Sequence, residues 1–170
     1  MTQRLIYFIL LLSLLNTTHA AETVGQVSIH GENLDIGDAA SVAIQSGNYL
    51  YGGLSLNHIS SDVVIQIDNR KTINPLYFFI GLKYTSKVSP FIEAGIDLPE
   101  ALIDEIFDNE DNAIDLTDYY LSSGLNFSIN KKFGISVYAK KYVFKYQAMS
   151  LFTTNKVRTD SYGASLVMRF

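Results

Sequence analysis

Hydrophobic and polar residues alternate along most of the chain, from Val24 to the C-terminus. Alternation with a period of two predicts β-strands that have one apolar face and one polar face. The clearest example is the last segment, whose apolar face consists of Tyr162, Ala164, Leu166, Met168 and Phe170. The opposite face is mostly small or polar: Ser161, Gly163, Ser165, Val167 and Arg169. The pattern therefore predicts an all-β protein.

The alternation predicts eight strands, joined by connections that are short and long in turn. The predicted strands are residues 24–32, 39–46, 49–60, 75–85, 89–98, 118–129, 133–146 and 157–170. The short connections are 47–48, 86–88 and 130–132, and the longer ones are 33–38, 61–74, 97–117 and 147–156. Short turns at one end and longer loops at the other are typical of bacterial single-chain membrane barrels.

The apolar faces indicate that the sheet meets lipid. The predicted strands 75–85, 89–98, 118–129 and 133–146 all repeat the division into an apolar and a more polar face. A soluble sandwich of about 150 residues cannot hide this many apolar faces, whereas a barrel in a bilayer turns them outward and pairs every backbone group by closure. We predict an eight-stranded antiparallel up-and-down transmembrane β-barrel. The segment from Val63 to Asp68 also has a strand pattern and is interpreted as an extension of the third strand beyond the bilayer. A ten-stranded barrel is the alternative, because the first sixty residues are the least clearly patterned.

The N-terminal segment predicts export. Arg4 precedes an apolar run from Leu5 to Leu15, which is too short to span a bilayer, and small or polar residues follow. Residues 1–20 are therefore predicted to be a signal peptide, cleaved after Ala20 or Ala21, and residues 21–170 an outer-membrane β-barrel. The chain has no Cys, which excludes a lipid anchor on cysteine and disulfide bonds.

Charge and aromatic content narrow the class further. Without Arg4, 12 basic and 17 acidic residues leave a net charge of −5, the wrong sign for binding nucleic acid. Tyr and Phe at the predicted strand ends fit the aromatic girdles of membrane barrels. The candidates are Tyr84, Tyr119, Phe127, Phe133, Tyr162 and Phe170.

The predicted inward face carries charges at Lys83, Glu93, Lys140 and Arg169. Lys83 and Glu93 are expected to face each other across the hairpin around Val88. Buried charges need partners, and eight strands enclose a space about wide enough for side chains to fill. We expect a plug of paired charges and Tyr hydroxyls; the alternative is a small gated pore.

An acidic segment between Asp97 and Asp118 holds nine of the seventeen acids and no Lys or Arg. Its candidate cation ligands are Asp104, Asp108, Glu110 and Asp111, because Ca²⁺ and Mg²⁺ prefer carboxylates. An EF-hand does not fit, since Ala113 replaces its Gly and Tyr119 stands where its bidentate acid belongs. The segment is predicted to be a solvated external loop without a resident metal or other cofactor.

His58 and Ser60 form the minority catalytic candidate. Two residues apart in a predicted strand, they share one face, and a His that activates a Ser is a route to ester cleavage. Such a pair also needs an orienting acid, and the sequence does not place one. No catalytic residue is therefore assigned.

The alternation, the signal peptide and the terminal Phe170 resemble the small OmpA/OmpX-type outer-membrane barrels. That resemblance implies a C-terminal assembly signal in Tyr162, Leu166, Met168 and Phe170, read by the barrel-assembly machinery after delivery by periplasmic chaperones. The segment Ser89-Pro90-Phe91-Ile92-Glu93-Ala94-Gly95-Ile96 is also similar to a strand of the outer-membrane lipid A deacylase family. That family's His-x-Ser would fall near Lys141-Tyr142-Val143, where neither residue occurs, so the likeness supports the fold and argues against the activity.

We expect a monomeric, non-enzymatic outer-membrane protein with a structural or surface-interaction role. Its loops are expected to contact outer-membrane lipids, lipopolysaccharide, ions or external ligands. The alternatives are a lipid A-modifying enzyme and a small gated pore. The sequence does not identify the external ligand.

Overall fold

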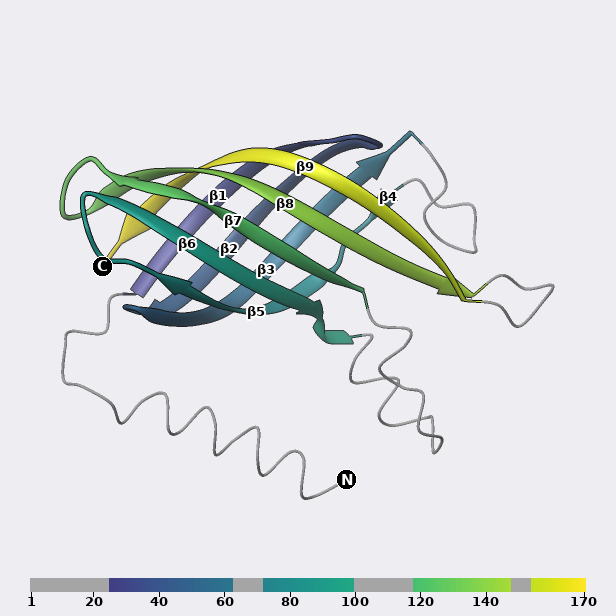
Figure 1. Cartoon of the computed structure of the whole chain (residues 1–170), viewed down its shortest axis with the longest axis horizontal. Helices are drawn as coiled ribbons and strands as arrows, with labels where there is room; N and C mark the ends of the chain where they lie inside the picture. The colour runs from purple at the N-terminus through teal and green to yellow at the C-terminus, as the bar shows by residue number, and fades with distance from the viewer. Residues whose placement is uncertain (1–24, 63–71, 100–117, 148–153) are drawn as a thin grey trace, which may run out of the picture.

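The computed structural model describes residues 25–62, 72–99, 118–147 and 154–170 (Figure 1). The strands are β1 (Gly25–Leu34), β2 (Gly37–Gly47), β3 (Leu50–Ser61), β4 (Thr72–Ile73), β5 (Leu76–Lys83), β6 (Val88–Asp97), β7 (Tyr119–Ser128), β8 (Phe133–Gln147) and β9 (Thr154–Arg169). Among the described residues, no helix is long and apolar enough to cross a bilayer.

The strands form a closed antiparallel barrel. Strands that are neighbours in sequence pair, except that β4 and β5 both pair with β3, and β1 pairs with β9 over Gln26–Leu34 and Ser161–Arg169. Closure leaves no free edge along the wall, which is why such a sheet is compatible with a bilayer. The predicted fold class is confirmed.

The barrel wall is eight strands wide, because β4 and β5 are two parts of one interrupted strand. Ile59 of β3 pairs with Ile73, and Leu56 pairs with Leu76, so β4 and β5 follow a single register along β3. Pro75 separates them because it has no N–H for the ladder, although its carbonyl accepts a hydrogen bond from the Asn57 N–H at 3.0 Å. Eight strands, with β4 and β5 counted as one, close the barrel, so the ten-stranded alternative is wrong. The segment from Val63 to Asp68 lies outside the described residues, as do residues 1–24.

The C-terminus, the first described residue Gly25 and the three short turns lie at one end of the barrel, here called the terminal end (Figure 1). There the Phe170 N–H donates to the Gly25 carbonyl at 3.0 Å and closes the seam between β9 and β1. The opposite end, here called the loop end, carries the β1–β2 turn and the β3–β4, β6–β7 and β8–β9 connections.

One loop-end connection differs from the prediction. Residues 33–38 were expected to form a longer loop, but pairing continues through Asn33↔Asp38 and Leu34↔Gly37, so Asp35 and Ile36 alone make the turn. Gly37 has a φ of 147°, and a Cβ there would lie 2.0 Å from the Ser60 carbonyl oxygen. A glycine thus lets the β1–β2 hairpin close tightly against β3.

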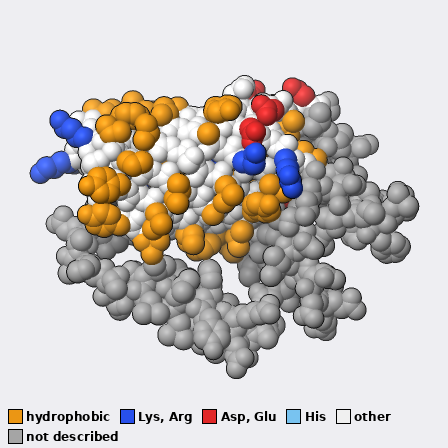
Figure 2. All heavy atoms as spheres, in the orientation of Figure 1, with side chains coloured by type: hydrophobic (Ala, Val, Ile, Leu, Met, Phe, Trp, Pro, Cys, Tyr) orange, Lys and Arg blue, Asp and Glu red, His pale blue; other side chains and the backbone are white. Residues whose placement is uncertain are grey.

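Side chains divide between the two faces of the wall as the alternation predicts. Large apolar residues cover the outside over much of its surface (Figure 2). The exposed set includes Ile29, Val42, Leu54, Ile80, Ile92, Leu121, Ile135 and Leu166. Alternate residues are buried in the lumen and are mainly aromatic, hydroxyl or charged. The distribution is the reverse of a water-soluble protein, whose apolar residues are mostly inside.

Candidate functional site

The lumen near the loop end is closed by an aromatic layer. Tyr77, Tyr120 and Tyr142 are fully buried, and their ring centroids lie 5.0 to 6.1 Å apart. Phe144 stacks on Tyr142 at 5.6 Å with an interplanar angle of 10°. β5, β7 and β8 supply these rings, and the same buried cluster includes Leu34 of β1, Ala39 of β2 and Ile59 of β3, so side chains from opposite sides of the barrel meet here. The predicted plug was of paired charges and Tyr hydroxyls; the layer consists of aromatic rings.

Glu32 and Lys140 form an ion pair beneath this layer. The Lys140 Nζ lies 2.7 Å from Glu32 Oε1, and the two side chains are 6% and 1% exposed. Three hydroxyls donate to the same carboxylate: Tyr142 and Ser161 to Oε2 at 2.8 Å each, and Tyr138 to Oε1 at 3.2 Å. The network surrounds the buried negative charge with donors, which is what makes its burial tolerable.

The ammonium group of Lys140 is also enclosed by ring faces. It lies 4.5, 5.3 and 5.1 Å from the ring centroids of Tyr120, Tyr138 and Tyr142, and it donates to the Tyr142 hydroxyl at 3.1 Å. Aromatic faces attract cations, and more strongly when water is excluded. The aromatic layer and the ion pair therefore support each other.

Gly163 allows side chains of β1 and β8 to meet inside the barrel. It lies on β9 between them, paired with Glu32 on one side and Tyr138 on the other. A Cβ there would be 2.7 Å from the Tyr138 hydroxyl and 2.8 Å from Glu32 Cγ. The bare backbone leaves the space in which these two side chains meet across an intervening strand.

Gly163→Ala is expected to lower the free energy of unfolding by about 1–3 kcal/mol, because overfilling a packed interior forces neighbours from their rotamers. Urea unfolding of the refolded barrel measures the change. Gly31→Ala is the matched control: nothing lies within 4 Å of a Cβ on the exterior at Gly31, so its stability should change by less than about 0.5 kcal/mol. Equal effects of the two substitutions would show that Gly163 has no packing role.

Glu93 and Lys83 were expected to face each other, but Glu93 has other partners. Its two oxygens accept hydrogen bonds from Tyr51 at 3.0 Å and Tyr120 at 2.6 Å. The register sets Glu93 opposite Gly81 and Lys83 opposite Phe91, so the two charges are offset along the strands. Lys83 instead lies over the Tyr51 ring, 5.1 Å from its centroid.

Arg169 lies at the terminal end and binds neutral oxygens. Its Nη2 donates to Asn126 Oδ1 at 3.0 Å, and its Nη1 to the carbonyls of Asn130 and Phe133 at 3.3 Å each. The guanidinium therefore ties the last strand to the β7–β8 turn.

A hydrogen-bonded chain leads from Glu32 into the rest of the lumen. Tyr138 bridges Glu32 and His30, with its hydroxyl 3.1 Å from His30 Nδ1, and Ser28 Oγ lies 2.7 Å from His30 Nε2. If the Tyr138 hydrogen goes to Glu32, then His30 Nδ1 must be the protonated nitrogen and Nε2 accepts from Ser28. Within this hydrogen-bonded series no carboxylate contacts His30 directly, because Tyr138 stands between His30 and Glu32.

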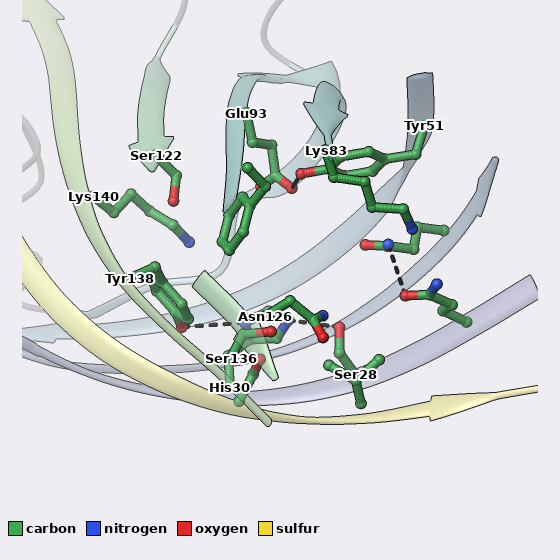
Figure 3. A pocket seen from close by; sticks show the side chains of 15 residues that line it. Ser28, His30, Tyr51, Lys83, Glu93, Ser122, Asn126, Ser136, Tyr138 and Lys140 are labelled. Carbon is green, nitrogen blue, oxygen red and sulfur yellow. Dashed lines mark hydrogen bonds between the residues drawn. The ribbon is translucent and has the colours of Figure 1, made fainter. Parts of the chain in front are cut away.

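A small polar cavity of about 50 Å³ opens on the terminal side of these networks. Figure 3 shows Lys140, Tyr138 and Glu93 directed into it, with His30 and Ser28 along the wall. The volume suits a few water molecules and is far below the 300–1,000 Å³ that is usual for a small-molecule ligand. Among the lining residues, the buried Ser165 hydroxyl has no protein partner, which makes it a natural contact for such water.

Glu32, His30 and Ser28 were not predicted as lumen residues from the sequence. The signal that was present is their common spacing of two, together with Gln26 and Leu34, on one face of β1. It was weak because β1 has small or polar residues on much of its other face as well, so the alternation does not stand out.

His58 and Ser60 both lie on the exterior near the loop end, on one face of β3. His58 Nδ1 is 2.7 Å from the Asn74 side-chain oxygen. That partner is an amide and does not supply the charge of an orienting carboxylate. Lys141 and Tyr142, near which the deacylase-like His-x-Ser would fall, point to opposite faces: Lys141 binds Asp160 outside at 3.2 Å, and Tyr142 is buried inside.

The candidate cation ligands Asp104, Asp108, Glu110 and Asp111 lie outside the described residues. Within the described ranges, no three His, Cys, Asp or Glu side chains come together as a metal site would require. Tyr162, Leu166, Met168 and Phe170 are all exposed on the exterior of β9 and at its end. Their reading by assembly factors stays a prediction.

The barrel is similar to solved natural and designed barrels. Neisserial surface protein A superposes with a TM-score of 0.57 at 9% identity over 87% of this chain and 97% of that protein. The N-terminal β-barrel domain of Pseudomonas aeruginosa OprF gives 0.54 at 11% identity over 85% and 97%. A structure described as "De novo design of transmembrane beta-barrels" gives 0.56 at 9% identity over 89% and 98%.

No protein-family model and no curated protein sequence matches the chain. At identities near 10% the structural likeness establishes the fold, and the predicted resemblance to small OmpA/OmpX-type barrels is confirmed at that level.

Proposed function

We propose that this chain is an outer-membrane β-barrel with a structural or surface-interaction role, and that it is neither an enzyme nor an open pore. The observation that carries the proposal is the combination of an apolar exterior with a lumen blocked by Tyr77, Tyr120 and Tyr142. A protein built to conduct or to bind a substrate inside needs a passage or a chamber, and the described lumen offers about 50 Å³.

The dimensions of the exterior support a bilayer setting. On β9 the lipid-facing residues run from Tyr162 to Phe170, which at ~3.4 Å per residue and a tilt of ~40° is about 20 Å along the barrel axis. The apolar band of bacterial barrels is about 25 Å tall. Exposed aromatic side chains border it at the terminal end, including Tyr49, Tyr84, Phe133 and Phe170.

Polar residues border the same band at the loop end. The exterior positions there include Asn33, Asp38, His58, Lys141, Arg158 and Asp160. In the proposed setting they lie at the level of lipopolysaccharide head groups. Lys141 and Arg158 have the charge to meet phosphates, and Asp160 the charge to meet bridging cations. External ligands would reach the connections at the loop end, which join the strands beyond these head groups.

The localisation is tested by fractionating cells that express the full chain and by running the membrane fraction on gels with and without boiling. We expect outer-membrane recovery and a mobility that changes on heating, because a closed barrel resists detergent until it is heated. Recovery of a folded, water-soluble protein contradicts the proposal.

The closed lumen is tested in planar bilayers. Refolded protein is expected to give no discrete current steps, since the aromatic layer leaves no water-filled path. Stepwise conductance would support the pore alternative instead. An altered lipid A acylation pattern in the same cells, measured by mass spectrometry and lost in His58→Ala, would favour the enzyme alternative.

A further inference from the structure

We infer that the terminal end of the barrel is a docking surface for anionic phospholipid head groups, built by Lys87, Lys131 and Lys132. The inference rests on the proposed membrane location and adds the lipid class that meets this end. All three side chains are exposed. They lie in the β5–β6 turn and the β7–β8 turn, which belong to the same rim of the barrel.

Charge is distributed unevenly along the barrel axis. Apart from Glu32 and Glu93 in the lumen, the described acids lie toward the loop end: Asp35, Asp38, Asp62, Asp97, Asp118 and Asp160. The terminal end has Lys83, Lys87, Lys131, Lys132 and Arg169, and no acid among its described residues. Figure 2 shows basic side chains projecting beyond the apolar surface at this end, and acidic ones gathered at the other. In a protein with an acidic net charge, the charged side chains described on this rim are thus all basic.

The β7–β8 turn is held in a fixed shape. Asn130 Oδ1 accepts hydrogen bonds from the N–H groups of Lys132 and Phe133, at 2.8 Å each. The Lys132 carbonyl accepts from the Arg169 N–H at 2.7 Å, and the Arg169 side chain binds the Asn130 and Phe133 carbonyls. The backbone positions of Lys131 and Lys132 are therefore set before any ligand arrives, which reduces the ordering cost of binding.

The β5–β6 turn is fixed in a similar way. Ser89 Oγ donates to the Ser86 carbonyl at 2.8 Å and accepts from the Ser86 N–H at 3.1 Å. Ser86 Oγ in turn donates to the Val88 carbonyl. Lys87 is carried at the tip of this turn, so both lysine-bearing turns are rigid parts of the wall.

The lysines follow directly on residues that contact the apolar phase. Lys131 and Lys132 stand between Ile129 and Phe133, which are 63% and 49% exposed, and Lys87 adjoins Val88, which is 46% exposed. Aromatic belts lie at the level of lipid head groups, so ammonium groups just beyond them reach the phosphates. A phospholipid leaflet fits this arrangement better than a soluble polyanion, because the charge and the apolar belt form one continuous surface.

The experiment measures lipid preference in the inserted barrel. The mature chain is refolded into phosphatidylcholine vesicles that contain spin-labelled phosphatidylglycerol or spin-labelled phosphatidylcholine, and the association of each with the protein is compared. Each lysine near an anionic surface contributes about fivefold. The variant Lys87→Gln/Lys131→Gln/Lys132→Gln should therefore reduce the preference for phosphatidylglycerol at least fivefold, and added salt should reduce the wild-type preference.

The matched control is Lys141→Gln/Arg158→Gln at the loop end, where Lys141 already pairs with Asp160 and acids share the rim, so the control should reduce the preference much less than the triple variant does. An unchanged preference in the triple variant, or an equal loss in the control, overturns the inference. So does binding to isolated peptidoglycan that depends on the three lysines without any lipid preference. Heat-modifiable mobility separates the two claims: a chain that never inserts defeats the proposed function as well, whereas an inserted barrel without lipid preference defeats this inference alone.

Discussion

Glu32→Gln is expected to lower the free energy of unfolding by about 3–5 kcal/mol, because it leaves the Lys140 ammonium buried without its counter-charge. The ion pair is 2.7 Å long, and Lys140 is 6% exposed, so the small cavity beside it leaves room for only a few water molecules, which do not supply a counter-charge. The new amide also turns an NH₂ group toward hydroxyls that donate to the carboxylate in the native barrel. Since the chain has no Trp, unfolding in urea is best followed by gel mobility or circular dichroism.

Two controls identify the cause. Glu32→Gln combined with Lys140→Met removes both charges and should recover most of the lost stability, because replacing both members of a buried pair is far cheaper than removing one. Asp160→Asn breaks the exterior pair with Lys141, whose side chains are 57% and 49% exposed, and should cost less than about 1 kcal/mol. A double variant as unstable as the single one would mean that packing, not charge, is responsible.

Tyr120→Ala is expected to have the second largest effect, because it removes a ring from the aromatic layer and one of the two hydroxyl donors to Glu93. Truncation of a buried aromatic residue costs about 3–5 kcal/mol. The same change opens the layer between Tyr77 and Tyr142, so current steps should appear in planar bilayers where the wild type gives none.

Tyr120→Phe separates these two effects. The ring stays, so the bilayer should remain silent. The 2.6 Å hydrogen bond to the Glu93 carboxylate is lost, at a cost of about 1.5–3 kcal/mol for a bond to a charged group. Conductance in Tyr120→Phe, or a silent bilayer with refolded Tyr120→Ala, would show that the ring is not what closes the lumen.

The faces of the wall were predictable from the sequence because they depend on local geometry. Successive side chains of a strand point to opposite sides, so the period of two places Ile92 outside and Glu93 inside without knowledge of any neighbour. Strand ends were close for the same reason, with β8 beginning at Phe133 as expected. The turn at Asp35 and Ile36 was not foreseen, because polar residues there resemble a loop although they continue the ladder above the apolar band.

The partners of the lumen charges were not predictable. Lys83 and Glu93 are close in sequence and share the inward face, yet the register of β5 and β6 offsets them. Glu32 and Lys140 are 108 residues apart and meet only because β1 closes onto β9. Glu32 and Tyr138 likewise meet across Gly163 of the intervening β9, a contact that depends on three strands at once.

By itself, the sequence determined that this chain forms a two-faced antiparallel wall with an apolar outside, because side-chain alternation is a property of each strand alone. The tertiary structure decided how many strands close the wall, which charges pair and that three tyrosines block the lumen. Those features depend on register and closure, which are set by the sum of contacts around the whole barrel and leave no local mark in the chain.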